Sequence, residues 1–291
     1  MKKITKAVIP AAGLGTRMLP ISKAVPKEML PIVDRPAISY LIDEAVASGI
    51  TDILIITAGG KESIEDYFDY SAVYDNALSA KGRTAEIERM HAIADSANIH
   101  FIRQKQAKGL GHAILTAKAF VGDDDFAVLY GDDIIVSEKP VTRQLLDIYE
   151  EFGRGVAGVK AVPWEQVFKY CSLKTEDVRE GVFRVTDMIE KPQSREVAFS
   201  NYSILGRVVL PAKIFDILEN TAPGAGNEIQ FTDAMCTLSR EEGMYAVDFE
   251  GTRYDMGSKL GFLIANVTEG LKSEEVGADF RAFLKEFTKE L

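Results

Sequence analysis

A short apolar run leads directly into a glycine loop at residues 7–17, which read Ala7-Val8-Ile9-Pro10-Ala11-Ala12-Gly13-Leu14-Gly15-Thr16-Arg17. A brief uninterrupted apolar run that ends at Pro or Gly is typical of a strand buried on both faces of a parallel sheet. Three more such runs follow, at residues 53–57, 99–103 and 126–130, and helical patterns separate them at residues 37–47, 62–68, 84–97 and 112–120. This alternation predicts a doubly wound, Rossmann-like α/β fold.

The second half of the chain has a different pattern. Strand-like runs at residues 155–162, 171–174, 182–189 and 203–210 follow one another, and a single helical pattern at 211–218 comes soon after them. We therefore expect a mixed, partly antiparallel extension of the sheet. Helical periodicity returns at residues 259–291, where an apolar stripe of Phe280, Phe283, Leu284 and Phe287 is suited to docking on the body or on another subunit. We expect one domain over residues 1–291, with parts at 1–150, 151–257 and 258–291.

The composition excludes several classes of protein. The 291 residues include 44 acidic and 34 basic side chains, for a net charge of −10. Binding of a nucleic-acid duplex or an anionic membrane requires a positive surface, so neither partner is expected. Two cysteines, Cys171 and Cys236, cannot form a disulfide framework and are expected to be reduced core thiols. No apolar run approaches the roughly 20 residues of a membrane span, and we expect a cytoplasmic protein.

Four loops follow the strands of the first half, at residues 10–22, 58–61, 104–111 and 131–133. In an open α/β sheet, ligands bind beyond the carboxyl ends of the strands. Three of these loops carry unusual chemistry, and the sequence assigns no role to the loop at 58–61.

The glycine loop is suited to a phosphate group. Gly13 and Gly15 let the backbone approach a ligand, and successive N–H groups can hold phosphate oxygens. A Walker loop is excluded because Gly-Lys-Ser/Thr is missing, and a dinucleotide fingerprint is disfavoured because Met18 replaces its third glycine. A glycine pair alone could equally be an ordinary tight turn. Arg17 and Lys27 add the two cations that a triphosphate requires.

The loop Gly131-Asp132-Asp133 places carboxylates at the end of a strand, where one could hold Mg²⁺ together with substrate phosphates. An aspartate-rich turn is the alternative. Asp255, after the strand-like run at residues 244–249, could be a second metal ligand. In the loop at 104–111, the Gln104 side chain offers one donor and one acceptor, which match a pyrimidine edge.

Glu190-Lys191-Pro192 closes the strand-like run at 182–189. The acid could bind a sugar hydroxyl and the lysine a phosphate. A surface ion pair is the alternative reading of the same two residues.

Taken together, these segments resemble the bacterial UTP–glucose-1-phosphate uridylyltransferases of the sugar-nucleotidyltransferase group. The resemblance runs from residue 4 to about residue 265. It is carried by the glycine loop at 11–17, Pro26-Lys27-Glu28-Met29-Leu30-Pro31-Ile32-Val33-Asp34, Gly109-Leu110-Gly111-His112-Ala113, Gly131-Asp132-Asp133, Glu190-Lys191-Pro192, and the stretch from Pro223 to Ala234.

The resemblance implies a role for each motif. Residues of the glycine loop would lie against the nucleotide, three further residues would read uracil, four would be catalytic, two would hold Mg²⁺, and five would bind the sugar phosphate. The nucleotide-binding set is Ala11, Ala12, Gly13, Gly15 and Thr16 with the uracil-reading Glu28, Gln104 and Gly109; the catalytic set is Arg17, Lys27, Asp132 and Lys191; the metal ligands are Asp132 and Asp255; and the sugar-phosphate set is Gly131, Glu190, Lys191, Ile204 and Gly206.

The implied reaction transfers a uridylyl group from UTP to glucose-1-phosphate, giving UDP-glucose and pyrophosphate by direct in-line displacement with Mg²⁺. Residues 1–150 would then be mainly nucleotide-binding, 151–257 mainly sugar-binding, and 258–291 a C-terminal helical segment that could contribute to a homo-oligomer, either a dimer or a tetramer. Where this family usually shows Tyr-Gly, the chain has Tyr170-Cys171, whose side chain could narrow the sugar pocket.

Three alternatives stay open at this stage. The enzyme could use dTTP or CTP in place of UTP, since the shared loops do not separate bases. It could be a catalytically inactive regulatory subunit that binds UDP-sugars, although Arg17, Lys27, Asp132 and Lys191 are all retained. A nicotinamide oxidoreductase is the third possibility, which Met18 weakens.

Overall fold

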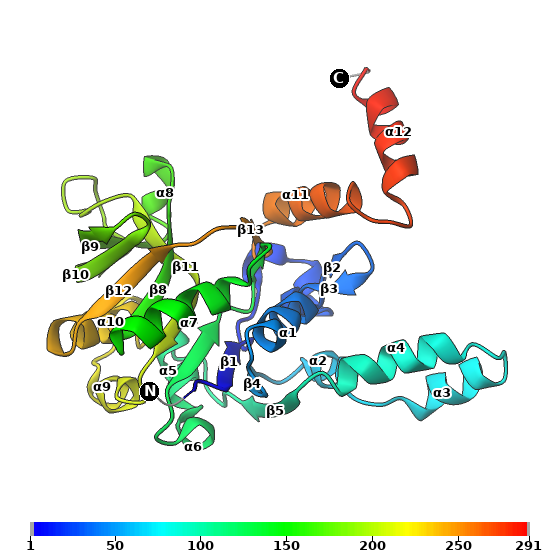
Figure 1. Cartoon of the computed structure of the whole chain (residues 1–291), viewed down its shortest axis with the longest axis horizontal. Coiled ribbons are helices and arrows are strands. Elements are labelled where there is room, and N and C mark those ends of the chain that lie inside the picture. Colours follow the sequence, from blue (N-terminus) through cyan, green and yellow to red (C-terminus); the bar gives the residue numbers. More distant parts are fainter. Residues whose placement is uncertain (1–2, 290–291) are drawn as a thin grey trace.

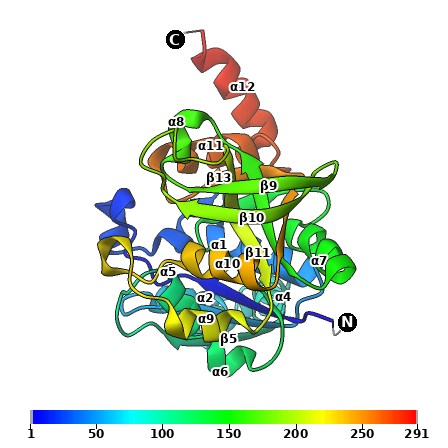
Figure 2. The ribbon, with the colours of Figure 1, turned by 90° about the vertical axis from the view of Figure 1, so that its left-hand side faces the viewer.

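The computed structural model describes residues 3–289 and contains a nine-stranded mixed sheet with helices on both faces (Figures 1 and 2). The spatial order of the strands is β5-β4-β1-β6-β11-β8-β12-β10-β9. Their bounds are β1 Lys6–Pro10, β4 Asp52–Thr57, β5 Asn98–Arg103, β6 Phe126–Leu129, β8 Gly155–Ala161, β9 Cys171–Arg179, β10 Val182–Glu190, β11 Tyr202–Leu210 and β12 Met244–Asp248. The predicted α/β fold is confirmed.

The four strands of the first half pair in parallel, as their sequence pattern predicts. Strand β1 lies between β4 and β6, with Ala7 opposite Ile53 on one side and Ala127 on the other. Strand β11 then pairs antiparallel with both β6 and β8, which starts the expected mixed extension. One prediction is wrong: β5 is not buried on both faces, because it forms the edge of the sheet and most of its residues are exposed or half-buried.

The helices have the following bounds: α1 Ala37–Ala47, α2 Glu62–Tyr67, α3 Ala72–Ser79, α4 Thr84–Ala94, α5 Leu110–Leu115, α6 Lys118–Val121, α7 Val141–Phe152, α8 Trp164–Val167, α9 Ile214–Asn220, α10 Phe231–Glu241, α11 Lys259–Gly270 and α12 Gly277–Phe287, with short 3₁₀ turns at Thr16–Met18, Ile21–Lys23, Lys27–Met29 and Ala225–Asn227. Two small sheets complete the chain. They pair β2 (Pro31–Ile32) with β3 (Arg35–Pro36) and β7 (Asp133–Val136) with β13 (Thr252–Asp255).

Two apolar clusters cover the two faces of the sheet. Side chains alternate along β1, so Ala7 and Ile9 pack into one cluster and Val8 into the other. The first cluster includes α1 and α7, and the second includes α5, α9 and α10. Both cysteines are buried free thiols, as predicted.

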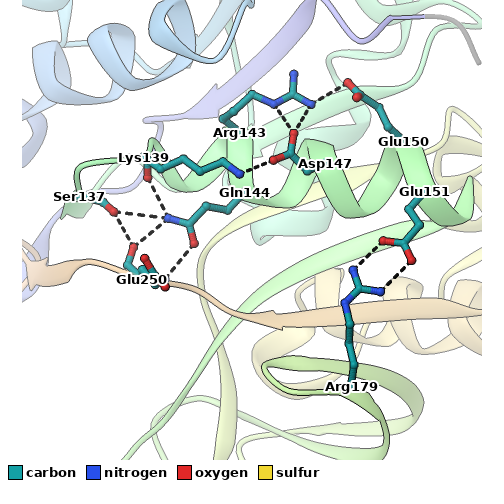
Figure 3. Close-up of polar contacts among 9 residues, drawn as sticks. All are labelled: Ser137, Lys139, Arg143, Gln144, Asp147, Glu150, Glu151, Arg179 and Glu250. Carbon is teal, nitrogen blue, oxygen red and sulfur yellow. Dashed lines mark hydrogen bonds and ion pairs between the residues drawn. The ribbon is translucent and has the colours of Figure 1, made fainter.

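Helix α7 was absent from the sequence prediction, although its inward face repeats Leu145, Ile148 and Tyr149 at helical spacing. Its outer face is polar (Figure 3). There, the Arg143 guanidinium contacts Asp147 and Glu150, and Arg179 of β9 makes a bidentate ion pair with Glu151 at 2.6–2.7 Å. Surface pairs of this kind contribute little individually. Gln144 makes two hydrogen bonds with the backbone of Glu250, which fixes the turn before β13.

Helix α11 packs beside β13 and β2, and α12 extends away from the rest of the molecule (Figure 1). Helix α11 starts at Ser258, whose hydroxyl accepts a hydrogen bond from the Gly261 N–H. In α12, Gly277 is the one buried residue, and Phe283 and Phe287 stack on each other with both rings exposed. Of the two alternatives for the final stripe, Phe283 and Phe287 do not dock on the body, and docking on another subunit stays a prediction. Residues 290 and 291 lie outside the described part of the chain.

A buried ion pair joins the two halves of the molecule. Arg207 of β11 and Glu44 of α1 are both buried, and the Arg207 Nη2 to Glu44 Oε2 distance is 2.6 Å. Burial raises the pKa of Glu44, but the Arg207 charge and hydrogen bonds from Arg207 and Thr142 lower it further, to below its ordinary value overall. Within residues 3–289, no helix is long and apolar enough to cross a membrane.

Candidate active site

A cavity of about 390 Å³ lies at the carboxyl ends of β1, β5 and β6, where the topology of a parallel sheet places ligands. Its walls come from the glycine loop, the segment that carries Lys27, the loop after β5 with the start of α5, the loop after β6, and the stretch before α10 that carries Glu228. The lining residues are Pro10, Ala12, Gly13, Leu14, Gly15, Thr16, Lys27, Glu28, Gln104, Ala107, Gly109, Leu110, Ala113, Tyr130, Gly131, Asp132 and Glu228.

All but one of the predicted nucleotide-binding residues line this cavity. Ala11 does not: its N–H donates to the Ile56 carbonyl, and its own carbonyl accepts a hydrogen bond from the Lys61 ammonium. The glycine loop and the loop after β6 are in close contact, because a Cβ at Gly131 would lie 2.6 Å from the Pro10 carbonyl oxygen. Only glycine permits this approach.

Four charged side chains converge at one end of the cavity. The Lys27 ammonium lies 2.5 Å from Asp132 Oδ2, and the exposed Arg17 guanidinium lies 3.7 Å from Asp132 and 3.8 Å from Asp255. A Cβ at Gly257 would approach three of them within 3.0 Å, at Arg17 Nη2, Asp132 Oδ2 and Asp255 Oδ1. Burial raises the pKa of Asp132, but Lys27 and Arg17 lower it below the usual range overall. Asp132 is therefore a carboxylate at neutral pH.

The described residues contain no group of three or more His, Cys, Asp or Glu side chains that could hold a metal ion. The donors around Gly257 are two carboxylates. That donor set suits Mg²⁺, which is commonly held by one or two protein carboxylates together with substrate phosphates and water.

Asp133, the neighbour of Asp132, has a structural environment that the sequence does not reveal. It is buried and paired with Arg253, whose guanidinium also lies 5.3 Å from the centre of the Tyr170 ring. Burial, with the nearby Asp132 and Asp255 charges, raises the pKa of Asp133 to about 6. In the ladder between β7 and β13, Asp133 is opposite Asp255, so the Asp133–Arg253 pair fixes the strand that carries Asp255.

The loop after β5 also lines the cavity, through Gln104, Ala107 and Gly109. The Gln104 amide nitrogen donates to the Gly109 carbonyl at 3.2 Å and to His112 Nδ1 at 2.9 Å. Gly109 has a φ of +89°, and a Cβ there would lie 2.7 Å from the Glu228 Cβ. The segment around Ile229 is bonded to this loop, since the Ile229 N–H donates to the Lys108 carbonyl. These contacts place a neutral amide beside a glycine backbone.

Sequence reasoning missed Lys61, which is buried and lies 2.8 Å from the buried carboxylate of Glu28. Lys61 follows β4 in the loop to which no role was assigned. The signal that could have found it is a lysine after Gly59-Gly60 at the carboxyl end of a buried strand.

Four of the predicted sugar-phosphate residues do not line the cavity. The Glu190 carboxylate accepts a hydrogen bond from the Thr232 hydroxyl at 2.7 Å and lies 3.4 Å from the Lys191 ammonium. Lys191 has a φ of +44°, uncommon for a residue with a side chain, and its side chain is 58% exposed. The Ile204 N–H donates to the Cys171 sulfur at 3.3 Å, and Gly206 packs against Asp133.

A larger cavity, of about 510 Å³, lies between α9 and α10. Its lining includes the acids Asp216, Asp233 and Glu241 and one lysine, Lys213. This cavity lies between two helices, whereas the smaller cavity is lined by the loops at the carboxyl ends of the parallel strands, where folds of this kind bind ligands.

Comparisons with known proteins were consistent with one another. A profile described as "Nucleotidyl transferase" matches residues 6–269. The chain is 52% identical over 288 residues to UTP–glucose-1-phosphate uridylyltransferase YngB of Bacillus subtilis, and this match covers 99% of this chain and 97% of the relative. It is 48% identical over 286 residues to a UTP–glucose-1-phosphate uridylyltransferase of Staphylococcus epidermidis, and this match covers 98% of this chain and 99% of the relative. Among solved structures, it is similar to a UDP-glucose pyrophosphorylase in complex with UDP-glucose (TM-score 0.85, 41% identity, 93% of this chain and 100% of the other) and to a UTP-bound enzyme of Acinetobacter baumannii (TM-score 0.90, 38% identity, 98% and 99%).

Proposed function

The chain belongs to the nucleotidyl transferase family, and we propose that it transfers a uridylyl group from UTP to glucose-1-phosphate, giving UDP-glucose and pyrophosphate. The observation that carries this proposal is the composition of the 390 Å³ cavity. Lys27 and Asp132 line one end, with Arg17 beside Asp132, and Gln104 and Gly109 line the other. Named relatives with this activity match nearly the whole chain.

In the proposed reaction, a phosphate oxygen of glucose-1-phosphate forms a bond with the α-phosphorus of UTP. The bond from that phosphorus to the bridging oxygen breaks, and its electron pair leaves with pyrophosphate. Such a displacement depends on positioning and on neutralisation of negative charge, and needs no nucleophile from the protein. We assign charge neutralisation on the triphosphate to Arg17 and Lys27, and the cradle for the nucleotide to Ala12, Gly13, Gly15 and Thr16. Ala11 would act through its backbone position in the same loop.

Asp132 and Asp255 would hold Mg²⁺, because their oxygens meet beside Gly257 and form the donor set that this ion prefers. When bound, Mg²⁺ would add positive charge next to the phosphates. Arg17 is the cation that lies within 4 Å of both of these carboxylates.

On the sugar side, we assign contacts with glucose hydroxyls to Glu190 and with the sugar phosphate to Lys191. Gly131 would lie between the two substrates, since it lines the cavity next to Asp132. The backbone at Ile204 and Gly206 would line the sugar pocket. The backbone N–H of Lys191 donates to the Tyr170 carbonyl, which fixes the lysine at the end of β10.

The experiment that tests this function is pyrophosphate release with Mg²⁺ and glucose-1-phosphate, comparing UTP, dTTP and CTP. We expect strong preference for UTP. Equal release with all three nucleotides would show no base preference, and the assignment would then be only to the wider nucleotidyltransferase group. No release, while UDP-glucose still binds, would instead favour a regulatory subunit.

We further propose a cytoplasmic homo-oligomer, either a dimer or a tetramer. The exposed apolar side chains of the two C-terminal helices support this, because an unpaired apolar face is stabilised by a partner. They include Leu260, Leu263, Phe283 and Phe287. Light scattering coupled to size exclusion would show a monomeric mass if the proposal is wrong.

A further inference from the structure

The buried pair of Glu28 and Lys61 lies at the wall of the cavity. Glu28 is 1% exposed and Lys61 is 7% exposed. The Lys61 ammonium lies 2.8 Å from Glu28 Oε2 and also donates to the Ala11 carbonyl of the glycine loop. One lysine from the loop after β4 therefore fixes both the glycine loop and the carboxylate of Glu28. The two residues are 33 positions apart in the chain.

The second oxygen of this carboxylate is available. Glu28 Oε1 is buried and has no hydrogen-bond partner among the described residues, whereas Oε2 is held by Lys61. Buried polar atoms in native proteins nearly always have a partner, and leaving one without a partner is costly. Because Glu28 lines the cavity, a ligand there can supply what is missing.

The chemistry of that partner is restricted. An ionised carboxylate only accepts hydrogen bonds, and it repels phosphate oxygens. Among the groups that a nucleotide offers, its partner must therefore be an N–H or O–H donor. A uridine nucleotide carries two kinds: the imide N–H of the base and the hydroxyls of the ribose.

We propose that Lys61 is a positioning residue that holds Glu28 ionised, so that Glu28 Oε1 accepts a hydrogen bond from an N–H or O–H donor of the nucleoside and makes the enzyme reject nucleotides that lack this donor. The inference rests on the proposed function, since it names how the same cavity selects its nucleotide. Cytosine presents a lone pair where uracil has its imide N–H, and a 2′-deoxyribose lacks one hydroxyl. The analogue that lacks the donor used by Glu28 would leave a buried charge without a partner.

The electrostatic environment supports this role for Lys61. Burial raises the pKa of Glu28 above its ordinary value overall, and the charges of Lys61 and then Lys27 limit that rise. Without Lys61 the carboxyl group would be protonated more readily and would become a donor. The acceptor character of Glu28 therefore depends on Lys61.

The test uses the full-length variants Lys61→Met, Lys61→Arg and Glu28→Gln. As the control we choose Lys118→Met, which removes an exposed lysine at the start of α6 that pairs with Asp216 and Glu219 and does not line the cavity. We would measure kcat/KM for UTP, CTP and 2′-dUTP at saturating glucose-1-phosphate, and the dissociation constants of UDP, CDP and 2′-dUDP by calorimetry.

We expect Lys61→Met and Glu28→Gln to lower kcat/KM for UTP by about 10- to 100-fold, the effect of losing a hydrogen bond to a charged group. The analogue that lacks the donor should be affected little, and the KM for glucose-1-phosphate should not change. Loss of the UTP-to-CTP preference identifies the base N–H as the donor, and loss of the UTP-to-dUTP preference identifies the ribose hydroxyl. Lys61→Arg keeps the positive charge and should retain part of the preference that Lys61→Met loses.

The inference is overturned if both preferences stay at the wild-type value in variants that bind nucleotide. If Lys61→Met alone fails to fold, the double variant Lys61→Met/Glu28→Gln removes both charges and is tested for the same preferences. A wild-type protein that binds UDP but releases no pyrophosphate would contradict the proposed function, while the three dissociation constants would still test the role of Lys61. Absence of UDP binding to the wild type would overturn both.

Discussion

The two halves of the molecule hold their proposed substrate groups in different ways. On the nucleotide side, residues from five segments line one cavity, and a buried oxygen of Glu28 has no hydrogen-bond partner among the described residues. On the sugar side, Glu190 and Ile204 already have partners within the protein, and Lys191 is largely exposed. We propose that the nucleotide side is largely preformed around its cavity, whereas on the sugar side Glu190 would exchange Thr232 for a sugar hydroxyl.

The difference follows from strand direction. Strands β4, β1 and β6 run parallel, so their carboxyl ends and the loops after them meet at one edge. Strands β9, β10 and β11 belong to the antiparallel extension, where the carboxyl ends of neighbouring strands lie at opposite edges of the sheet. Variants in the two halves can therefore distinguish contacts that exist before the ligand binds from contacts that form when an internal partner is replaced.

The largest effect is expected at the junction between the halves. Arg207→Met would leave the Glu44 carboxylate buried without its partner, and we expect the free energy of unfolding to fall by about 3–5 kcal/mol in urea denaturation. The double variant Arg207→Met/Glu44→Gln should lose less. A loss below about 1 kcal/mol for Arg207→Met would show that the halves are not joined by this pair.

The same pair has a pH signature. Because the pKa of Glu44 is lower in the folded protein than its ordinary value, its contribution to stability is present above that ordinary value and is lost as pH falls through the folded-state pKa. Wild type should therefore lose stability in acid more steeply than the double variant does. Parallel acid-denaturation curves would contradict this assignment.

On the nucleotide side, Asp132→Asn should lower kcat by about 10²–10³-fold or more without changing the circular dichroism spectrum. The reason is that the variant removes the negative charge that lies beside Lys27, Arg17 and Asp255. The matched control is Asp123→Asn in an exposed turn, which should leave kcat unchanged. Near-normal turnover of Asp132→Asn at saturating Mg²⁺ would exclude Asp132 as the metal ligand.

On the sugar side, Lys191→Ala should raise the KM for glucose-1-phosphate by about 10-fold and leave the KM for UTP nearly constant, since a single charged hydrogen bond from an exposed side chain is lost. Lys191→Arg keeps the charge and should show a smaller rise. Equal changes in both KM values would place Lys191 at the nucleotide instead.

The smallest effect is expected for Cys171→Gly. The Cys171 sulfur accepts the Ile204 N–H, and removal of the side chain frees that N–H and opens space beside the proposed sugar pocket. We expect at most a fewfold change in the preference for glucose-1-phosphate over a sugar phosphate that is bulkier at C2. An unchanged preference would mean that Cys171 does not limit the pocket.

Much of the nucleotide side could be predicted from the sequence because its signals are local. A buried parallel strand is an uninterrupted apolar run, and the rule that ligands bind beyond the carboxyl ends of such strands identifies the loops. Lys61 and Arg253 could not be assigned in this way. Their roles depend on partners far away in sequence, Glu28 and Asp133, and a charged residue beside a turn is more often solvated.

The second half was harder to predict for a physical reason. Strand β11 inserts between β6 and β8, so its pairing depends on contacts distant in sequence rather than on its own pattern. In β9, the prediction ended at Lys174 because Glu176, Asp177 and Arg179 are polar and exposed, yet their backbone pairs with β10. The sugar-side residues could be identified from family motifs, but the residues with which they form hydrogen bonds inside the protein could not be predicted.

The most direct measurement is a crystal structure with UDP-glucose and Mg²⁺. We predict uracil beside Gln104 and Gly109, the diphosphate between Lys27 and Arg17, and glucose against Glu190 with its hydrogen bond to Thr232 exchanged for a sugar hydroxyl. The side chains of the nucleotide half should move little and those of the sugar half should rearrange. UDP-glucose bound in the acidic cavity between α9 and α10, or rearrangement confined to the nucleotide half, would contradict this account.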